Sequence, residues 1–266
     1  MADETYRIFA VRYAMREATR KDHFLGGDPD GDRPMPMDYF VWAVVNDART
    51  VVVDTGFTAP VAAKRGRTHL RQPAEALALV GVDAGTVEDV VITHLHYDHV
   101  GTISDFPQAR FHLQERELAF ATGRPMLDDG IRHSFEEADI LSIVEGLHRG
   151  RVVLHDGADE LAPGISLHLI GGHTGGNQVV RVRTERGWVV LASDASHYYE
   201  NMESDRPFTV AYEPERVRAG FRALRALADS PRHVIPGHDP LVLQRYPAPS
   251  ADLEGIAVRL DLPPGD

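Results

Sequence analysis

The nine residues from Thr93 to Gly101 (THLHYDHVG) limit what this chain can fold into more than any other stretch. They contain four side chains that can bind a metal ion: His94, His96, Asp98 and His99. The β-branched run 90–92 just before them predicts a short buried strand that ends at Thr93. The four side chains then lie on the turn at the C-terminal end of that strand, where α/β sheets usually place their sites.

The spacing of these side chains indicates how they divide between cations. Residues two apart in an extended segment lie on one face, so His94 and His96 can bind the same ion. Asp98 and His99 follow the turn and can point at a second ion nearby. Imidazole nitrogen with some carboxylate suits zinc or another borderline divalent metal. We therefore predict a metal site here rather than a polar loop that happens to be rich in histidine.

Three predicted strands later in the chain each deliver one more potential ligand at the C-terminal end: His173 after 165–170, Asp194 after 188–192 and His238 after 232–236. Each of these residues, taken alone, would more often be structural. Together they supply what the first cluster lacks, because four residues cannot fill two metals that each take four or five ligands.

The composition excludes several classes of function. With 28 basic and 40 acidic residues the formal charge is −12, which argues against a nucleic-acid or anionic-membrane partner. The chain has no cysteine, so the metal ligands must be His, Asp and Glu. The acidic start, 1–5, does not resemble a secretory signal, and no apolar run reaches the roughly 18 residues that a membrane span needs. We expect a cytoplasmic protein.

Hydrophobic patterning predicts alternating strands and helices. The predicted strands are 6–13, 40–45, 50–53, 87–92, 109–113, 152–154, 165–170, 188–192 and 232–236. A helix is predicted at 73–80, stopped by Gly81, and an amphipathic helix at 214–229. The range 114–150 looks helical in pieces. No repeat or shift in composition marks a boundary, so we predict one domain over 1–266.

The segment 16–36 is dense in glycine and proline, which predicts a long loop. Methionines and aromatic residues close it: Met35, Met37, Tyr39 and Phe40. These side chains could line the mouth of a substrate site or anchor the loop to the core, since such residues are common in packing. The residues themselves leave both interpretations open.

Two polar residues also have more than one interpretation. Asp54, directly after the predicted strand 50–53, could orient a ligand histidine or cap the following turn, and the local sequence favours the cap. His112 lies inside a predicted strand with no motif around it, so a structural histidine is favoured over a ligand.

The ordered pattern His-x-His-x-Asp-His, followed by a lone His, a lone Asp and a lone His, resembles the metallo-β-lactamase superfamily over roughly 39–239. The resemblance implies a four-layer αβ/βα sandwich of two mixed sheets. It also implies a ligand set for each of two metals: His94, His96 and His173 for one, Asp98, His99 and His238 for the other, with Asp194 bridging. Asp54 matches the family's Asp-Thr-Gly turn, a position behind the ligands. The expected cofactor is two divalent metal ions, zinc first, with iron, manganese or cobalt as alternatives.

Within that family the chain looks most like the N-acyl homoserine lactonase group. The long early loop, the motif Ser193-Asp194-Ala195-Ser196 and the motif Gly237-His238-Asp239 carry this likeness. It implies a small-molecule lactone or ester that is opened by a hydroxide shared between the metals, with the leaving alkoxide protonated through Asp98 or solvent. His96 counts against the oxygen-reducing diiron branch, which has Glu there, and the acidic charge counts against the nucleases. Dimers are common among the lactonases, so a homodimer is also allowed.

The chain departs from the lactonases three residues after the bridging aspartate. Those enzymes carry a tyrosine there that is thought to bond the lactone oxygen, and this chain has His197, with Tyr198 next to it. His197 could donate the same hydrogen bond, Tyr198 could swing in, or the substrate differs.

Three alternative functions stay open beside the lactonase interpretation. A glyoxalase II-like thioester hydrolase needs a basic cluster, and the arginines available read more simply as a solvated helix face: Arg216, Arg218, Arg222 and Arg225. A mononuclear iron oxygenase of the same fold is a second alternative. A non-catalytic protein that has kept the fold is the third, and the full ligand set argues against it.

Overall fold

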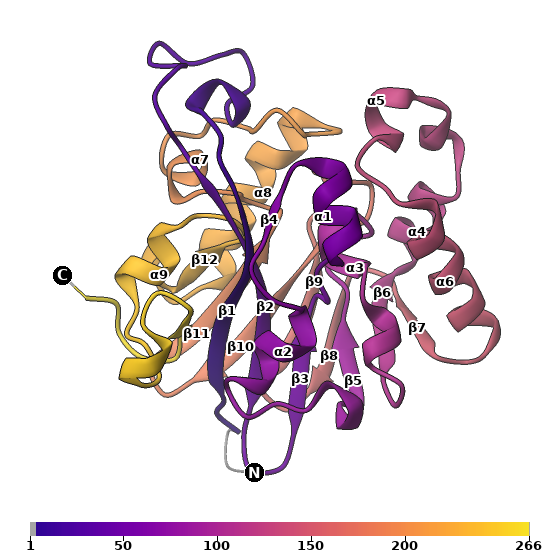
Figure 1. Ribbon diagram of the computed structural model, residues 1–266, viewed down its shortest axis with the longest axis vertical. Helices are drawn as coiled ribbons and strands as arrows, with labels where there is room; N and C mark the ends of the chain where they lie inside the picture. The colour runs from indigo at the N-terminus through magenta and orange to yellow at the C-terminus, as the bar shows by residue number, and fades with distance from the viewer. Residues whose placement is uncertain (1–3, 266) are drawn as a thin grey trace.

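The computed structural model describes residues 4–265; residues 1–3, part of the acidic start, and residue 266 lie outside it. Two β-sheets pack face to face, and helices cover the outer face of each sheet (Figure 1). This architecture is the expected four-layer αβ/βα sandwich.

The first sheet is built from both ends of the chain. Its strand order is β13 (Ala257–Arg259), β1 (Arg7–Arg16), β2 (Met37–Val45), β3 (Thr50–Val53), β5 (Asp89–Val91), β6 (Arg110–Gln114) and β7 (Val152–His155), with β4 (Thr68–His69) paired to β1. Strands β3, β5, β6 and β7 are parallel to one another. Their C-terminal ends therefore lie at one edge of the sheet.

The second sheet has the order β12 (Val234–Pro236), β11 (Gly187–Ser193), β10 (Gln178–Thr184), β9 (Ile165–Leu169) and β8 (Ala158–Ala162). β11 is parallel to β12, and β10 is antiparallel to both β9 and β11. β9, β11 and β12 consequently run in the same direction, so the residues that follow them meet at one edge.

Successive side chains of each strand alternate between the two faces of the sheet, and this alternation produces two separate cores. In β2, Trp42 and Val44 are buried in the core between the two sheets, while Val41 and Ala43 are buried in the core beneath the outer helices. Successive side chains of a strand point to opposite faces, so a strand that is apolar at every position must be covered on both sides. Such strands require a helical layer outside the sheet.

Nine α-helices lie among the described residues: α1 (Ala59–Arg65), α2 (Pro73–Ala78), α3 (Tyr97–Val100), α4 (Glu115–Ala121), α5 (Asp129–Arg132), α6 (Glu137–His148), α7 (Tyr199–Glu203), α8 (Pro214–Leu227) and α9 (Leu241–Arg245). Short 3-10 turns occupy Arg20–Asp22, Ala84–Thr86, Ile103–Asp105, Arg124–Leu127, Pro231–His233 and Ala251–Leu253. α1, α2 and α6 cover the first sheet, and α8 covers the second through Val217, Phe221 and Leu224.

Most predicted elements are confirmed, with ends shifted by a few residues. The hairpin β2–β3, the helices α2 and α8 and the strand before the histidine cluster all form. Eight helices and strands were not predicted: α1, α3, α7, α9, β4, β8, β10 and β13. β10 does alternate, but arginines occupy its less buried positions. β8 is a largely exposed edge strand without an apolar face, so its pairing with β9 defines it rather than its own pattern.

The predicted loop before β2 is present and is anchored to the core. Met37, Tyr39 and Phe40 are buried, with Met37 and Tyr39 in the outer core and Phe40 between the sheets. Its outer part is tied to the segment after β11, because Arg20 pairs with Asp28 and with Glu200 at 2.5–2.9 Å. These contacts favour the anchoring role of the aromatic residues.

His112 has a structural role, as predicted. Its Nε2 lies 2.9 Å from Asp89 Oδ1, and its Nδ1 lies 3.0 Å from His155 Nε2. These bonds join β5, β6 and β7 and lie apart from the histidine cluster.

Within residues 4–265, no helix combines the length and the apolar character that a membrane crossing requires.

A half-buried carboxylate on α6, that of Asp139, gives a pH-dependent prediction. Burial and the neighbouring Glu136 raise the pKa of Asp139 to about 6, so the folded state disfavours the ionised form and stability falls as the pH rises from about 4 to about 6. Asp139→Asn should raise the free energy of unfolding at pH 7 by about 1–3 kcal/mol and flatten this dependence. Urea unfolding at pH 5 and pH 7.5 measures both effects.

Glu137→Gln, on the exposed face of the same helix, is the matched control and should change little. A less stable Asp139→Asn protein at pH 7 would contradict the prediction.

Candidate metal centre

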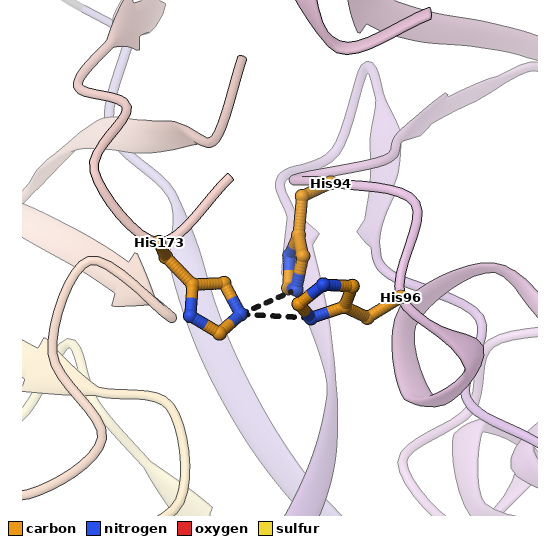
Figure 2. Close-up of side chains that lie close together, drawn as sticks. All are labelled: His94, His96 and His173. Atoms are coloured by element: carbon orange, nitrogen blue, oxygen red, sulfur yellow. Dashed lines mark hydrogen bonds between the residues drawn. The ribbon is translucent and has the colours of Figure 1, made fainter. Parts of the chain in front are cut away.

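Three histidines from two distant segments converge at the shared edge of the sheets. His94 and His96 follow β5, and His173 lies in the loop between β9 and β10. His173 Nε2 is 3.1 Å from His94 Nε2 and 2.9 Å from His96 Nδ1. Figure 2 shows the three rings pointing toward one another, with the nitrogens meeting at a common point. All three side chains are buried.

A second group lies beside the first. Asp98, His99 and His238 are buried, with ligand atoms close enough to hold one ion. Asp194 connects the groups: its Oδ2 lies 3.2 Å from His173 Nε2, and its Oδ1 lies 2.9 Å from His238 Nε2. The structure thus brings together all seven residues that the resemblance assigned as ligands.

Each histidine ring has one nitrogen that faces the cluster and one that faces away from it. A hydrogen bond donated by the nitrogen that faces away fixes the proton there and leaves the other nitrogen unprotonated. His173 Nδ1 lies 2.6 Å from the carbonyl oxygen of Val210, and a carbonyl can only accept, so this nitrogen carries the proton. Thr93 donates its hydroxyl proton to Asp54, so His94 Nδ1 donates to Thr93 Oγ1. Both rings then direct an Nε2 lone pair at the centre. A metal-binding histidine is usually oriented by this kind of outer bond.

Electrostatics differ between the two groups. Burial and the neighbouring imidazoles hold the pKa of His94 well below its usual value, and burial does the same for His96. At His99 burial also acts to lower the pKa, but Asp54, Asp194 and Asp98 outweigh it and raise the pKa well above the usual value. The first group therefore offers neutral nitrogen ligands, and the second favours a positive charge.

The arrangement fits cations on chemical grounds. Unprotonated nitrogens about 3 Å apart repel one another unless a proton or a cation lies between them. His99 Nε2 and Asp194 Oδ1 are buried, and the contacts of Asp194 Oδ1 with His238 Nε2 at 2.9 Å and with His99 Nε2 at 3.4 Å lack hydrogen-bond geometry. Unsatisfied buried polar atoms are costly, and they are expected where an ion belongs. Burial alone would raise the pKa of Asp194, yet four imidazoles outweigh it and keep that pKa well below its usual value.

Asp54 orients a histidine of this cluster. Its Oδ2 lies 2.7 Å from His99 Nδ1, and its Oδ1 accepts the backbone N–H of Thr93 at 2.7 Å. Its backbone is in the left-handed region, with φ at 60°. The cap that the local sequence favoured is therefore wrong, because the carboxylate turns back toward the cluster instead of toward the following turn.

The structure separates the two residues proposed to bind substrate. His197 Nε2 lies 3.0 Å from Asp194 Oδ2, and its ring stacks on Phe208 with centroids 3.8 Å apart. The Tyr198 hydroxyl instead lies 3.0 Å from His23 Nε2 and 3.1 Å from the carbonyl oxygen of Pro36. His197 therefore faces the cluster, whereas the hydroxyl of Tyr198 is engaged beneath the early loop.

Sequence reasoning missed several residues that support the cluster. The hydroxyls of Thr93 and Ser193 lie 2.8 Å apart and both bond to Asp54. Gln178 reaches from the second sheet to the carbonyl oxygens of Ile92 and His112 in the first. Their position next to predicted ligands or strand ends was the available signal, but residues of these types are also common in ordinary turns.

A cavity of about 290 Å³ opens at His96 and His173. Its apolar lining is Phe120, Ile131, Val210, Ala211 and Tyr212, and its polar lining beyond the two histidines comes from Asp128, Gly130, Ser134 and Thr209. Asp128 accepts the N–H of Gly130, and Thr209 donates to the carbonyl of Asp22, so these two side chains already have partners. The cavity therefore offers an apolar wall and a polar wall beside the two histidines.

This fold and this ordered cluster define a class of protein. Residues 35–238 match the metallo-beta-lactamase superfamily, and the chain belongs to it. A probable metallo-hydrolase of Mycobacterium tuberculosis is 28% identical over 197 residues, which are 65% of this chain and 60% of that protein. An N-acyl homoserine lactonase of Bacillus thuringiensis subsp. kurstaki is 27% identical over 165 residues, 61% of this chain and 60% of the relative. The chain thus spans about 60% of the length of these curated relatives.

Solved structures share the fold. A quorum-quenching N-acyl homoserine lactone lactonase superposes with a TM-score of 0.74 at 21% identity, covering 89% of this chain and 94% of that one. A dizinc quorum-quenching lactonase, in complex with its product, superposes with a TM-score of 0.68 at 16% identity, covering 88% and 87%. The N-acyl homoserine lactonase group proposed from the motifs thus lies among both kinds of relative.

The bonds of Asp54 give a prediction about metal affinity. Asp54→Asn keeps the shape and tolerates the left-handed backbone, because asparagine adopts it readily. The change removes the carboxylate that orients His99, so metal binding should weaken about 10–100-fold, the usual effect of losing such a partner. Competition of the metal-free protein with a chelating indicator measures the affinity. The exposed Asp47→Asn in the β2–β3 turn is the control, and equal affinities for the two variants would refute the role of Asp54.

Proposed function

We propose that this protein is a dinuclear metal-dependent hydrolase that opens a lactone or related ester ring. The observation that carries the proposal is the pair of buried ligand groups joined by Asp194. His94, His96 and His173 would hold one divalent ion, and Asp98, His99 and His238 the other, with Asp194 between them. Zinc suits this nitrogen-rich donor set, and a dizinc lactonase of the same fold supports the choice.

Two adjacent divalent ions acidify bound water to a pKa of about 7 and polarise a carbonyl oxygen. The chain contributes the remaining functions. The burial of all seven side chains would limit the access of bulk water to the ions and strengthen the electrostatics around them. Asp98, on the first turn of α3, would carry a proton to the leaving alkoxide, with solvent as the alternative route. This division of labour needs no covalent intermediate on the protein.

His197 is the side chain we assign to the substrate oxygen. Burial lowers its pKa to about 3, so the ring is neutral at physiological pH, and the nearby Asp194 carboxylate places the proton on Nε2. Stacking on Phe208 restrains the ring. When Asp194 is engaged by cations, this N–H is free to bond a carbonyl or ring oxygen. Tyr198 is the less favoured donor, because its hydroxyl already has two partners.

The cavity and the relatives support the proposed substrate class. Its lining is about half apolar, and its one charged side chain apart from the histidines is Asp128. An uncharged substrate with an apolar chain, such as an N-acyl homoserine lactone, suits this lining. The N-acyl homoserine lactonases among the relatives support the same class.

A thioester with several carboxylates suits the site less well. Arg216 donates to the carbonyl of Ile170, Arg218 pairs with Glu215, and Arg225 donates to the carbonyl of Met202. None of the arginines of α8 lines the cavity at His96 and His173. The basic cluster that a glyoxalase II-like enzyme would need is therefore engaged elsewhere.

The first experiment combines a metal count with a substrate panel. Purified protein is analysed for bound metal, and proton release is followed with N-acyl homoserine lactones, γ-lactones, aryl esters and S-lactoylglutathione. We expect two metals per chain, a preference for lactones, and loss of hydrolysis after chelation that returns with Zn²⁺. Cleavage of thioesters alone would overturn the substrate class, and one iron without hydrolysis would overturn the mechanism.

The assignment of His197 gives a second prediction. His197→Phe keeps a ring on Phe208 and removes the N–H, so kcat should fall about 10²–10³-fold, as when a donor to a developing oxyanion is lost. Metal content should stay unchanged, because His197 lies outside the two proposed ligand groups. His197→Tyr restores a hydroxyl donor and should recover part of the activity. Steady-state kinetics with metal analysis test this, and full activity of the phenylalanine variant would exclude the role.

A further inference from the structure

One buried carboxylate outside the ligand set joins the two loops that carry the three histidines. Glu117 is in the first turn of α4 and is completely buried. Its Oε1 accepts the backbone N–H of Leu95 at 2.9 Å. Its Oε2 accepts the backbone N–H of Gly176 at 2.9 Å and the hydroxyl of Thr174 at 2.5 Å. Three donors from two separate loops therefore meet on one side chain.

The donors lie next to the ligands. Leu95 stands between His94 and His96, and Thr174 directly follows His173. The first loop ends a strand of the first sheet, and the second connects two strands of the other sheet. A carboxylate that holds both backbones therefore controls how closely His173 approaches the other two rings, where the nitrogens are 2.9–3.1 Å apart.

The backbone around this contact leaves no space for an alternative packing. A Cβ at position 176 would lie 2.1 Å from the backbone nitrogen of Glu117, and one at 175 would lie 2.7 Å from the ring of Phe120. Only glycine allows the start of α4 to approach the loop this closely. The two glycines and Glu117 thus form one close contact between helix and loop.

A carboxylate suits the three donors better than an amide. An ionised carboxylate only accepts hydrogen bonds, whereas a glutamine side chain accepts at its oxygen and donates at its nitrogen. In Glu117→Gln the amide nitrogen would face either Leu95 N–H or the pair from Thr174 and Gly176. One loop would lose its acceptor, and a buried donor without an acceptor is costly.

We propose that Glu117 is a positioning residue that holds the histidine loops in the geometry for binding a divalent cation. The inference rests on the proposed metal centre and adds a residue outside its ligand set. We expect its effect to be largest at the group of His94, His96 and His173, because the three bonds hold the backbone directly beside these residues. The group of Asp98, His99 and His238 depends instead on Asp54 and on the carbonyl of Asp38.

The experiment titrates metal-free protein with Zn²⁺ against a chelating indicator and repeats it with Co²⁺, following the visible absorption. The variants are Glu117→Gln and Glu115→Gln, the second being an exposed glutamate in the same turn. We expect two binding steps in the parent and in Glu115→Gln. In Glu117→Gln we expect one step weakened about 10–100-fold, with a changed Co²⁺ spectrum and the other step retained.

Thermal unfolding of the metal-free proteins separates positioning from stability. If Glu117→Gln melts at a lower temperature but binds both ions with unchanged affinity and spectrum, Glu117 is merely structural and the inference is wrong. Should that variant fail to fold, Thr174→Val decides, because it removes one bond of the three. Weaker binding at one step supports the inference, and unchanged binding overturns it. A parent protein that binds no metal would refute the proposed function instead.

Discussion

The structure depends on bringing unprotonated imidazole nitrogens to within about 3 Å of one another in a buried part of the protein. In isolation these nitrogens repel, and the buried carboxylates beside them cannot all be neutralised by protons. A positive ion removes both difficulties, so the same contacts that would destabilise an empty core become ligands. The outer bonds of His173 and His238 to backbone carbonyls support this arrangement, because they direct the remaining nitrogen inward.

Holding seven side chains at this geometry requires the two sheets to be fixed relative to one another near the edge. Apolar packing between the sheets supplies most of the burial but little directional control. Gln178 and Glu117 fix the relative position of neighbouring elements by directional hydrogen bonds. Gln178 of the second sheet bonds to the backbone of the first, and Glu117 of α4 bonds to the backbone of two loops. Asp54, Thr93 and Ser193 perform the same function behind His99 and His94. Such buried polar networks are stabilising only when every member has its hydrogen-bond partners. The network behind the cluster therefore favours this one packing of the two sheets over others.

The cavity beside the cluster is built differently. The cavity at His96 is lined by the segments 120–134 and 209–212, which lie outside the strands that carry the ligands. The segment 209–212 is tied to the early loop, because Thr209 donates to the carbonyl of Asp22. A fold can therefore keep its metal site while these connections vary, so the family defines the centre and the loops define the substrate.

The sequence by itself determined the types and order of the candidate ligands, the alternation of the strands and the position of the cluster at strand ends. These features are local, because a strand's period or a cluster such as 94–99 can be read from neighbouring residues. Tertiary structure decided the rest. Asp54 lies 39 residues from Thr93, and Glu117 lies 59 residues from Gly176. Their partners exist only once the sheets have packed. The same is true of His197 and Tyr198, which are adjacent in sequence. The first contacts Asp194 of the cluster, and the second contacts His23 of the early loop. A hydrogen bond between distant segments leaves no local pattern, and only the fold reveals it.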